Sequence, residues 1–136
     1  MKVKFLNPSL MMIILLLSAC NFISPIDPLD GTSWYVSAIH DSPVLEKPIL
    51  SVEFKDGTVG GSSGCNSYSG DYTIRGNNIS IESIAMTLMA CMDMAVMEQE
   101  STFLENLENA QTFTLSENQL VIFGADGKSL VLTKLP

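Results

Sequence analysis

The sequence predicts an α+β domain in which many short antiparallel strands accompany a single helix. Short apolar runs with period-two alternation recur along the chain, and turn-forming residues separate them as in β-hairpins. One later segment changes to the 3.6-residue periodicity of an amphipathic helix. A chain of 136 residues suffices for one domain with its own core. We therefore expect an antiparallel, barrel-like sheet with one helix.

The first part of the domain is predicted to consist of two strands and the start of a third. Alternation of apolar and polar residues indicates half-buried strands, and Asp-Gly is typical of a tight hairpin turn. The expected elements are a strand over 34–39 with Trp34, Val36 and Ala38 on one face, a loop over 41–48, a strand carrying Leu50, Val52 and Phe54, a turn at Asp56-Gly57, and a return strand from Thr58.

The second part contains a glycine- and serine-rich stretch at 60–71, further strands and the helix. Apolar residues of the helix share one face, and its acids lie mostly elsewhere. We expect paired acids such as Glu98/Glu100 and Asp41/Glu46 to be solvated. The expected elements are a strand with Tyr72 and Ile74, a turn at 75–78, a strand with Ile79, Ile81 and Ile84, a helix over 94–110 with Val96, Phe103, Leu104 and Leu107 on its apolar face, strands over 112–115, 119–123 and 130–133, and a hairpin at Asp126-Gly127.

Residues 1–19 carry the three parts of a secretory signal peptide. The apolar run is shorter than the roughly 20 residues that a transmembrane helix needs, so a membrane-spanning helix is the weaker alternative. The positive end, the apolar core and the small residues before the cut are Lys2 and Lys4, Leu10–Leu17, and Ser18 with Ala19.

The end of this segment, Leu17-Ser18-Ala19-Cys20, resembles the lipobox of bacterial lipoproteins. The resemblance implies that Cys20 becomes the first residue and is acylated, so that the protein meets the membrane through its N-terminal lipid. Each buried methylene contributes about 0.8 kcal/mol, and two or more chains anchor stably. Because Asn21 and not aspartate follows, the resemblance favours the outer membrane in a cell with two membranes. We expect a lipid-anchored protein of the cell envelope.

Residues 20–30 follow as a lipidated cysteine and a tether with two prolines and no periodicity. The domain is then expected over residues 31–136. The formal charge is −8, and loss of Lys2 and Lys4 with the signal makes it about −10. Such acidity argues against nucleic acid as a partner, because phosphates need neutralising cations.

Three cysteines are present, and the lipid accounts for Cys20. We expect Cys65 and Cys91 to form a disulfide in an oxidising compartment. The two cysteines are 26 residues apart, and a disulfide that closes a loop of that length contributes about 3 kcal/mol to stability in the chain-entropy model. Two alternatives stay open, a pair of buried free thiols and a redox-active pair.

Two motifs around these cysteines resemble those of the META domain family, to which the heat-shock protein HslJ belongs. The resemblance covers nearly all of residues 31–135 and includes Trp34. It implies about seven or eight short strands curled into a partial barrel around one helix. The family is associated with heat shock and envelope stress, and it supplies no catalytic residue. The motifs are Val59-Gly60-Gly61-Ser62-Ser63-Gly64-Cys65-Asn66-Ser67-Tyr68-Ser69-Gly70-Asp71-Tyr72 and Thr87-Leu88-Met89-Ala90-Cys91.

The motif residues have a structural interpretation and a binding interpretation. Asn66 can fix a turn through local hydrogen bonds, and Tyr68 and Tyr72 alternate on one strand face, so a structural role is the first interpretation. The second is a surface that binds an envelope protein or a small apolar ligand. Its candidate residues are Asn66, Tyr68, Tyr72, Met89 and Met92.

Catalysis and metal binding have weaker support. Gly60-Gly61-Ser62-Ser63-Gly64 matches the nucleophile-elbow pattern, but a strand and not a helix is predicted to follow. His40 lies in a proline-containing loop and is expected to be exposed. We predict a non-enzymatic module without catalytic residues, cofactor or metal. The alternative is a Cu(I)-binding or redox protein that uses Cys65, Cys91 and the soft thioethers of Met86, Met89, Met92, Met94 and Met97.

Overall fold

A computed structural model describes residues 25–134. Nine strands form one antiparallel sheet, and a single helix interrupts their succession. The elements in order are β1 (Thr32–Ile39), β2 (Ser42–Pro43), β3 (Ser51–Lys55), β4 (Thr58–Ser62), β5 (Ser67–Arg75), β6 (Asn78–Met86), α2 (Met94–Glu108), β7 (Ala110–Leu115), β8 (Gln119–Gly124) and β9 (Ser129–Lys134).

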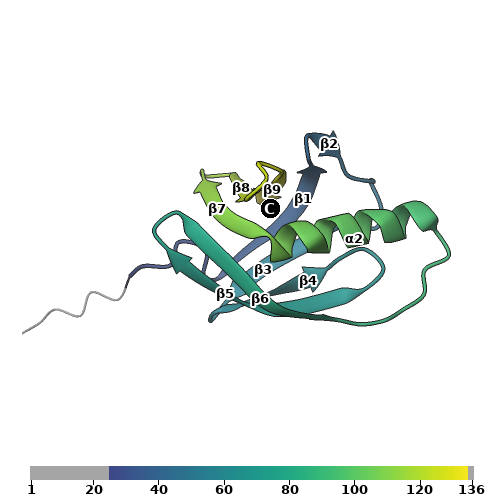
Figure 1. Ribbon diagram of the computed structural model, residues 1–136, viewed down its shortest axis with the longest axis horizontal. Helices are drawn as coiled ribbons and strands as arrows, with labels where there is room; N and C mark the ends of the chain where they lie inside the picture. Colours follow the sequence, from purple (N-terminus) through teal and green to yellow (C-terminus); the bar gives the residue numbers. More distant parts are fainter. Residues whose placement is uncertain (1–24, 135–136) are drawn as a thin grey trace, which may run out of the picture.

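The sheet closes into a barrel because β1 pairs with β9 as well as with β3. Eight strands form the ring, while β2 is a short addition to β1 within the predicted 41–48 loop. The predicted α+β class is confirmed, and the barrel is closed where a partial one was expected. Figure 1 shows α2 lying between β7 and the β4–β6 side of the sheet. The helix thus packs one face against the curled sheet and leaves the other face exposed.

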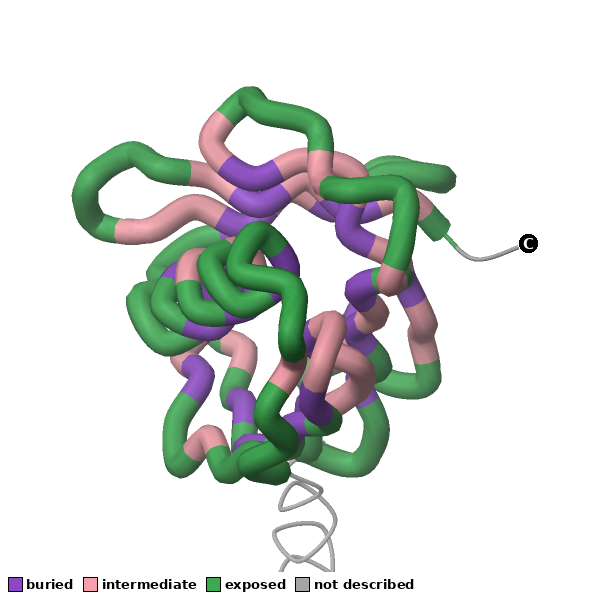
Figure 2. Tube along the Cα trace, turned by 90° about the vertical axis from the view of Figure 1, so that its right-hand side faces the viewer, coloured by how far each residue is buried: buried purple, intermediate pink, exposed green. Residues whose placement is uncertain are grey.

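The core forms between the inner face of the barrel and α2. Trp34, Phe54 and Phe103 are fully buried, and burying each such side chain contributes roughly 1.5–3 kcal/mol. Phe54 meets Tyr72 edge-on at a centroid distance of 4.9 Å, and Tyr68 meets Phe103 at 5.5 Å. Figure 2 shows the buried stretches on the strands and on α2, with exposed loops around them. The predicted common face of the two tyrosines is therefore a core face.

The predicted hairpin turns at Asp56-Gly57, 75–78 and Asp126-Gly127 are confirmed. Asp56 and Gly57 both have positive φ, of 50° and 78°, which is the conformation of the tight turns that suit a twisted hairpin. Each turn sets the register of the two strands that it joins.

The first strand differs from its predicted alternation at its end. Its pairing with β9 shifts between Val36 and Ala38, which marks a β-bulge. The extra residue turns the following side chains over, so Ile39 is buried and Ala38 is only half-buried. Ala38 was wrongly placed on the inner face because a bulge depends on the partner strand.

The chain joins the domain earlier than the predicted boundary at residue 31. Leu29 is fully buried in the core. Asp27 accepts hydrogen bonds from the Leu29 backbone N at 2.8 Å and from the Tyr72 hydroxyl at 2.6 Å. Residues 27–30, which were predicted to belong to the tether, therefore pack on the barrel. The predicted signal peptide, Cys20 and the start of the tether lie outside the described residues.

Candidate functional site

The segment between β4 and β5 is cross-linked to the segment between β6 and α2. Cys65 and Cys91 form a disulfide with their Cα atoms 6.0 Å apart, which confirms the predicted pair. We call residues 63–66 the motif loop and residues 87–93 the methionine loop. Gly61, just before the motif loop, has a φ of 152°, and a Cβ there would collide with the Ser51 carbonyl. Glycine is thus required where the loop leaves β4.

Asn66 joins the two loops through its side chain. Its Oδ1 accepts hydrogen bonds from Thr87 Oγ1 at 2.8 Å and from the Met89 backbone N at 2.7 Å. The residue is only 5% exposed, and a buried amide with satisfied polar atoms stabilises the loops that it connects. The methionine loop is therefore held by hydrogen bonds as well as by the disulfide.

The carboxylate of Glu100 on α2 completes this network from the helix side. It accepts hydrogen bonds from Ser63 Oγ at 2.7 Å, from the Asn66 backbone N at 2.8 Å and from Asn66 Nδ2 at 2.7 Å. Ser63 Oγ and the Ser63 backbone N also approach the Asn66 carbonyl, each at 2.8 Å. One helix side chain thus fixes both ends of the motif loop.

Burial would raise the pKa of Glu100, but the hydrogen bonds from Ser63 and Asn66 and from the loop backbone outweigh it, so the pKa lies below its ordinary value. The prediction that Glu100 is a solvated acid is wrong, since the side chain is 5% exposed. A sequence signal was present. At about 100° of rotation per residue, Glu100 lies only about 40° from Val96 on the helix, within the apolar face. Its charge led to the prediction that it is solvated, although its position on the helix is that of a core residue.

The five residues of the predicted partner-binding surface do not lie on one surface, because three are buried and two are exposed. Tyr68 and Tyr72 are 4% exposed, and Asn66 is buried in the network described above. Tyr68 donates from its hydroxyl to the Ser51 carbonyl at 3.0 Å. Burial raises the pKa of Tyr72, and its hydrogen bond to the Asp27 carboxylate adds to the shift. These three residues support the loops from inside, and Met89 and Met92 remain at the surface.

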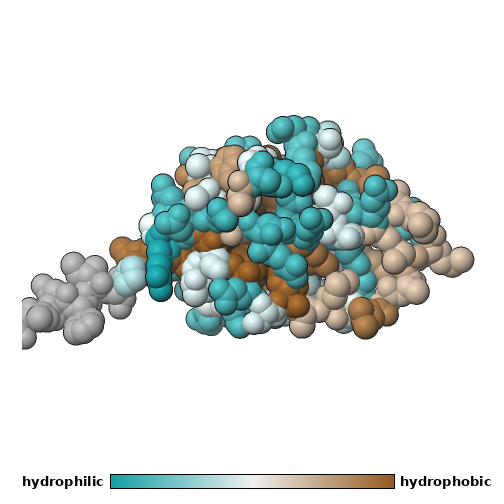
Figure 3. Space-filling view, in the orientation of Figure 1, coloured by the Kyte–Doolittle hydropathy of each residue, from teal (hydrophilic) through white to brown (hydrophobic). Residues whose placement is uncertain are grey.

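The methionine loop exposes large apolar side chains. Leu88 is 91% exposed and Met92 is 100% exposed, and Met89 is also largely in contact with solvent. Met94, the first residue of α2, is exposed beside the loop. Figure 3 shows a hydrophobic patch at the right-hand end of the molecule, where Figure 1 places the segment between β6 and α2. Exposed apolar patches in soluble domains often mark interaction sites. This loop, held by a cross-link and by Asn66, is the candidate site.

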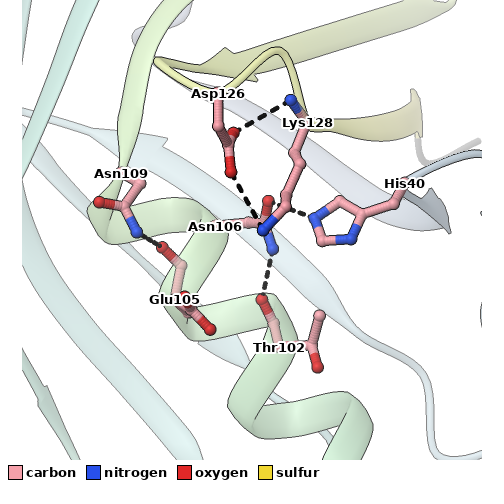
Figure 4. A network of polar contacts seen from close by, with 7 residues as sticks. All are labelled: His40, Thr102, Glu105, Asn106, Asn109, Asp126 and Lys128. Carbon is pink, nitrogen blue, oxygen red and sulfur yellow. Dashed lines mark hydrogen bonds and ion pairs between the residues drawn. The ribbon is translucent and has the colours of Figure 1, made fainter.

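His40 is half-buried and not simply exposed, so that prediction is wrong. Its Nε2 lies 2.7 Å from Oδ1 of Asn106, whose Nδ2 donates to the Thr102 carbonyl at 2.7 Å (Figure 4). Because the amide orientation leaves Oδ1 as an acceptor, the imidazole donates from Nε2. The histidine therefore links the end of β1 to α2, in a role that sequence periodicity did not indicate.

The nucleophile-elbow match has no matching geometry. Ser62 ends β4, and the strand β5 follows the loop where the elbow requires a helix. Within residues 25–134, no group of three or more His, Cys, Asp or Glu side chains has an arrangement suited to a metal ion. No helix in that same range is long and apolar enough to cross a membrane. The Cu(I) alternative through the methionines stays a prediction.

A family model described as "META domain" matches residues 27–136. Similar solved structures include a protein determined by NMR with 26% identity and a TM-score of 0.64, covering 78% of this chain and 91% of the other. An NMR structure of a protein from Burkholderia xenovorans has 20% identity and a TM-score of 0.65, covering 99% and 92%. A crystal structure of a DUF4847 family protein from Bacteroides vulgatus ATCC 8482 has 18% identity and a TM-score of 0.57, covering 79% and 94%. Comparison with curated proteins gave no match.

Proposed function

Because this chain belongs to the META domain family, we propose that it is a lipid-anchored module of the cell envelope that binds a partner and performs no catalysis. The carrying observation is the methionine loop, which holds apolar side chains in solvent while a disulfide and Asn66 fix its backbone. A binding segment that is rigid before contact loses less entropy when it binds. We include in this proposal that the module acts in the response to envelope or heat stress, with which the family is associated.

The proposed anchor gives the domain an orientation. Asp27, where the chain first packs on the barrel, is the seventh residue after Cys20, so an acylated cysteine would lie within at most about 25 Å of that end. Figure 1 shows the described chain starting at the left and the β6–α2 segment at the right. Under this proposal the methionine loop lies at the end of the domain opposite the anchor, where a partner in the space beyond the membrane could reach it.

Replacing Cys20 by alanine is expected to move the protein from the membrane fraction to the soluble fraction, because no acyl chain can then be attached. Fractionation and immunoblotting of cells measure the change. Cys65→Ser is the control, since it should lower stability and leave the protein at the membrane. A Cys20→Ala protein that stays with the membrane would show that the lipobox resemblance is misleading.

Capture of partners from envelopes tests the binding role. Leu88→Ser combined with Met92→Ser is expected to reduce the yield of a co-purified protein about tenfold, because exposed apolar anchors carry most interface energy. Ile49→Ser is the matched control, since Ile49 is an exposed apolar residue on another loop. Quantitative mass spectrometry compares the three. Equal yields from the wild type and the double variant would contradict the role of the loop.

A further inference from the structure

The barrel has a weak seam beside α2. On one side, β6 pairs with β5 along most of its length, from Arg75↔Asn78 to Tyr68↔Met86. On its other side, the one registered partner within residues 25–134 is Thr112 of β7, opposite Asn78. The rest of β6 therefore presents an unpaired edge toward the helix. Such an edge is a template on which an extended chain can add as a strand.

A groove of about 510 Å³ lies between this edge and α2. Its apolar lining comes from Ile84 and Met86 of β6 and from Met97 and Leu104 of the helix. Met86 directly precedes the methionine loop in the sequence, and Met97 lies in the first turns of α2 shortly after it, so the groove adjoins the methionine loop. The groove thus offers both unpaired backbone and apolar contact.

The strand register tells which side chains an added strand would place in the groove. Met86 lies opposite Tyr68, whose side chain is in the core. Ile84 is two residues away and shares that face. An added strand would alternate in the same way, with every second side chain against the groove and the others toward solvent.

The charge of the groove selects the chemistry of the strand. Glu105 and Glu108 line it from the helix, and neither takes part in an ion pair among the described residues. The whole chain carries a formal charge of −8. A second copy of this chain would bring like charges together, so the groove favours a cationic segment.

We propose that this groove binds an extended segment of a partner protein in which apolar and basic residues alternate, and that the segment adds to the edge of β6. The proposal rests on the binding role proposed above and names the chemistry of the partner. Ser83, with a φ of 56°, interrupts β6 with a bulge. The regular edge is therefore short, and the affinity should be moderate.

The test uses the domain with its disulfide intact and a fluorescent peptide of about ten residues in which leucine and lysine alternate. Fluorescence anisotropy measures binding. Met97→Lys is expected to weaken binding about tenfold, because it places a charge in the apolar lining. Ile49→Lys is the matched control, since Ile49 is an exposed apolar residue outside the groove and outside the methionine loop. Glu105→Lys should weaken binding and reduce its salt dependence, whereas Glu98→Lys should leave both near the wild-type values.

A second peptide of the same composition with proline at its centre should bind at least about tenfold more weakly, because proline removes a backbone donor from the ladder. Hydrogen exchange at residues 84–86 should slow with the first peptide. Equal binding of both peptides would overturn strand addition, and wild-type affinity in Met97→Lys would overturn the groove. Dimerisation of the free domain that Met97→Lys abolishes would assign the edge to a second copy. None of these measurements depends on the lipid or on the capture of partners by the methionine loop. The proposed function can therefore be correct even if the groove does not bind a strand.

Discussion

Replacing Glu100 by alanine is expected to lower the free energy of unfolding by about 3–4 kcal/mol at neutral pH. The carboxylate accepts hydrogen bonds from Ser63 Oγ and from the backbone and side-chain nitrogens of Asn66. Its removal leaves buried donors without a partner, and each such donor costs about 1–3 kcal/mol. Urea denaturation followed by tryptophan fluorescence measures the loss, since Trp34 is buried in the core.

Glu98→Ala is the matched control for this change. Glu98 is an exposed acid on the same helix, and its side chain forms no ion pair in the described part of the chain. Its replacement should change the free energy of unfolding by less than about 0.5 kcal/mol. Equal effects of the two alanine variants would mean that the network around Asn66 does not stabilise the fold.

The pH dependence gives a second test of Glu100. Its pKa is below the ordinary value of 4.5 in the folded protein, so the charged form stabilises the fold. That contribution is complete above the unfolded-state pKa and is lost as the pH falls through the folded-state pKa. Glu100→Gln lacks this titration. The difference in stability between the wild type and Glu100→Gln should therefore be largest near neutrality and shrink below about pH 4.5.

The sequence predicted the elements that depend on local chemistry. The hairpin at Asp56-Gly57 follows from two residues that tolerate positive φ. The helix over Met94–Glu108 follows from the change to helical periodicity. The structure adds its cap, since the Asp93 carboxylate accepts a hydrogen bond from the Ala95 backbone N at 2.9 Å. The cysteine pair followed from elimination of Cys20 and from the compartment. These inferences needed no knowledge of which strand lies beside which.

The features that were missed depend on contacts between distant segments. Leu29 looked like part of a tether because two prolines precede it and no periodicity is present, yet it fills a core position that only the closed barrel creates. The bulge in β1 needs the register of β9. The open edge of β6 was also invisible, since it results from a strand pair that ends after Asn78. Sequence periodicity indicates which residues are buried, but not where the pairing between two neighbouring strands ends.

Removing the disulfide with Cys65→Ala and Cys91→Ala is expected to lower the free energy of unfolding by about 3 kcal/mol. The two cysteines are 26 residues apart in the sequence, and a cross-link over such a loop restricts the unfolded chain. The barrel pairs and the Asn66 contacts remain in the double variant. Its domain should therefore stay folded at room temperature, with a lower midpoint in urea.

The matched control is the wild-type protein with a strong reductant, which should reproduce the double variant. The wild type should lose about 3 kcal/mol on reduction, and the double variant should not respond. If reduction leaves the wild-type midpoint unchanged, the cross-link contributes nothing to stability.

Hydrogen exchange at Leu88 and Met89 distinguishes the two interactions that hold the methionine loop, the disulfide and the hydrogen bond to Asn66. Exchange that quickens at Leu88 in the double variant, while the Met89 amide stays protected by Asn66, would show that the disulfide fixes the exposed half of the loop. Because a looser loop loses more entropy when it binds, partner capture by the double variant should fall even though its barrel is intact.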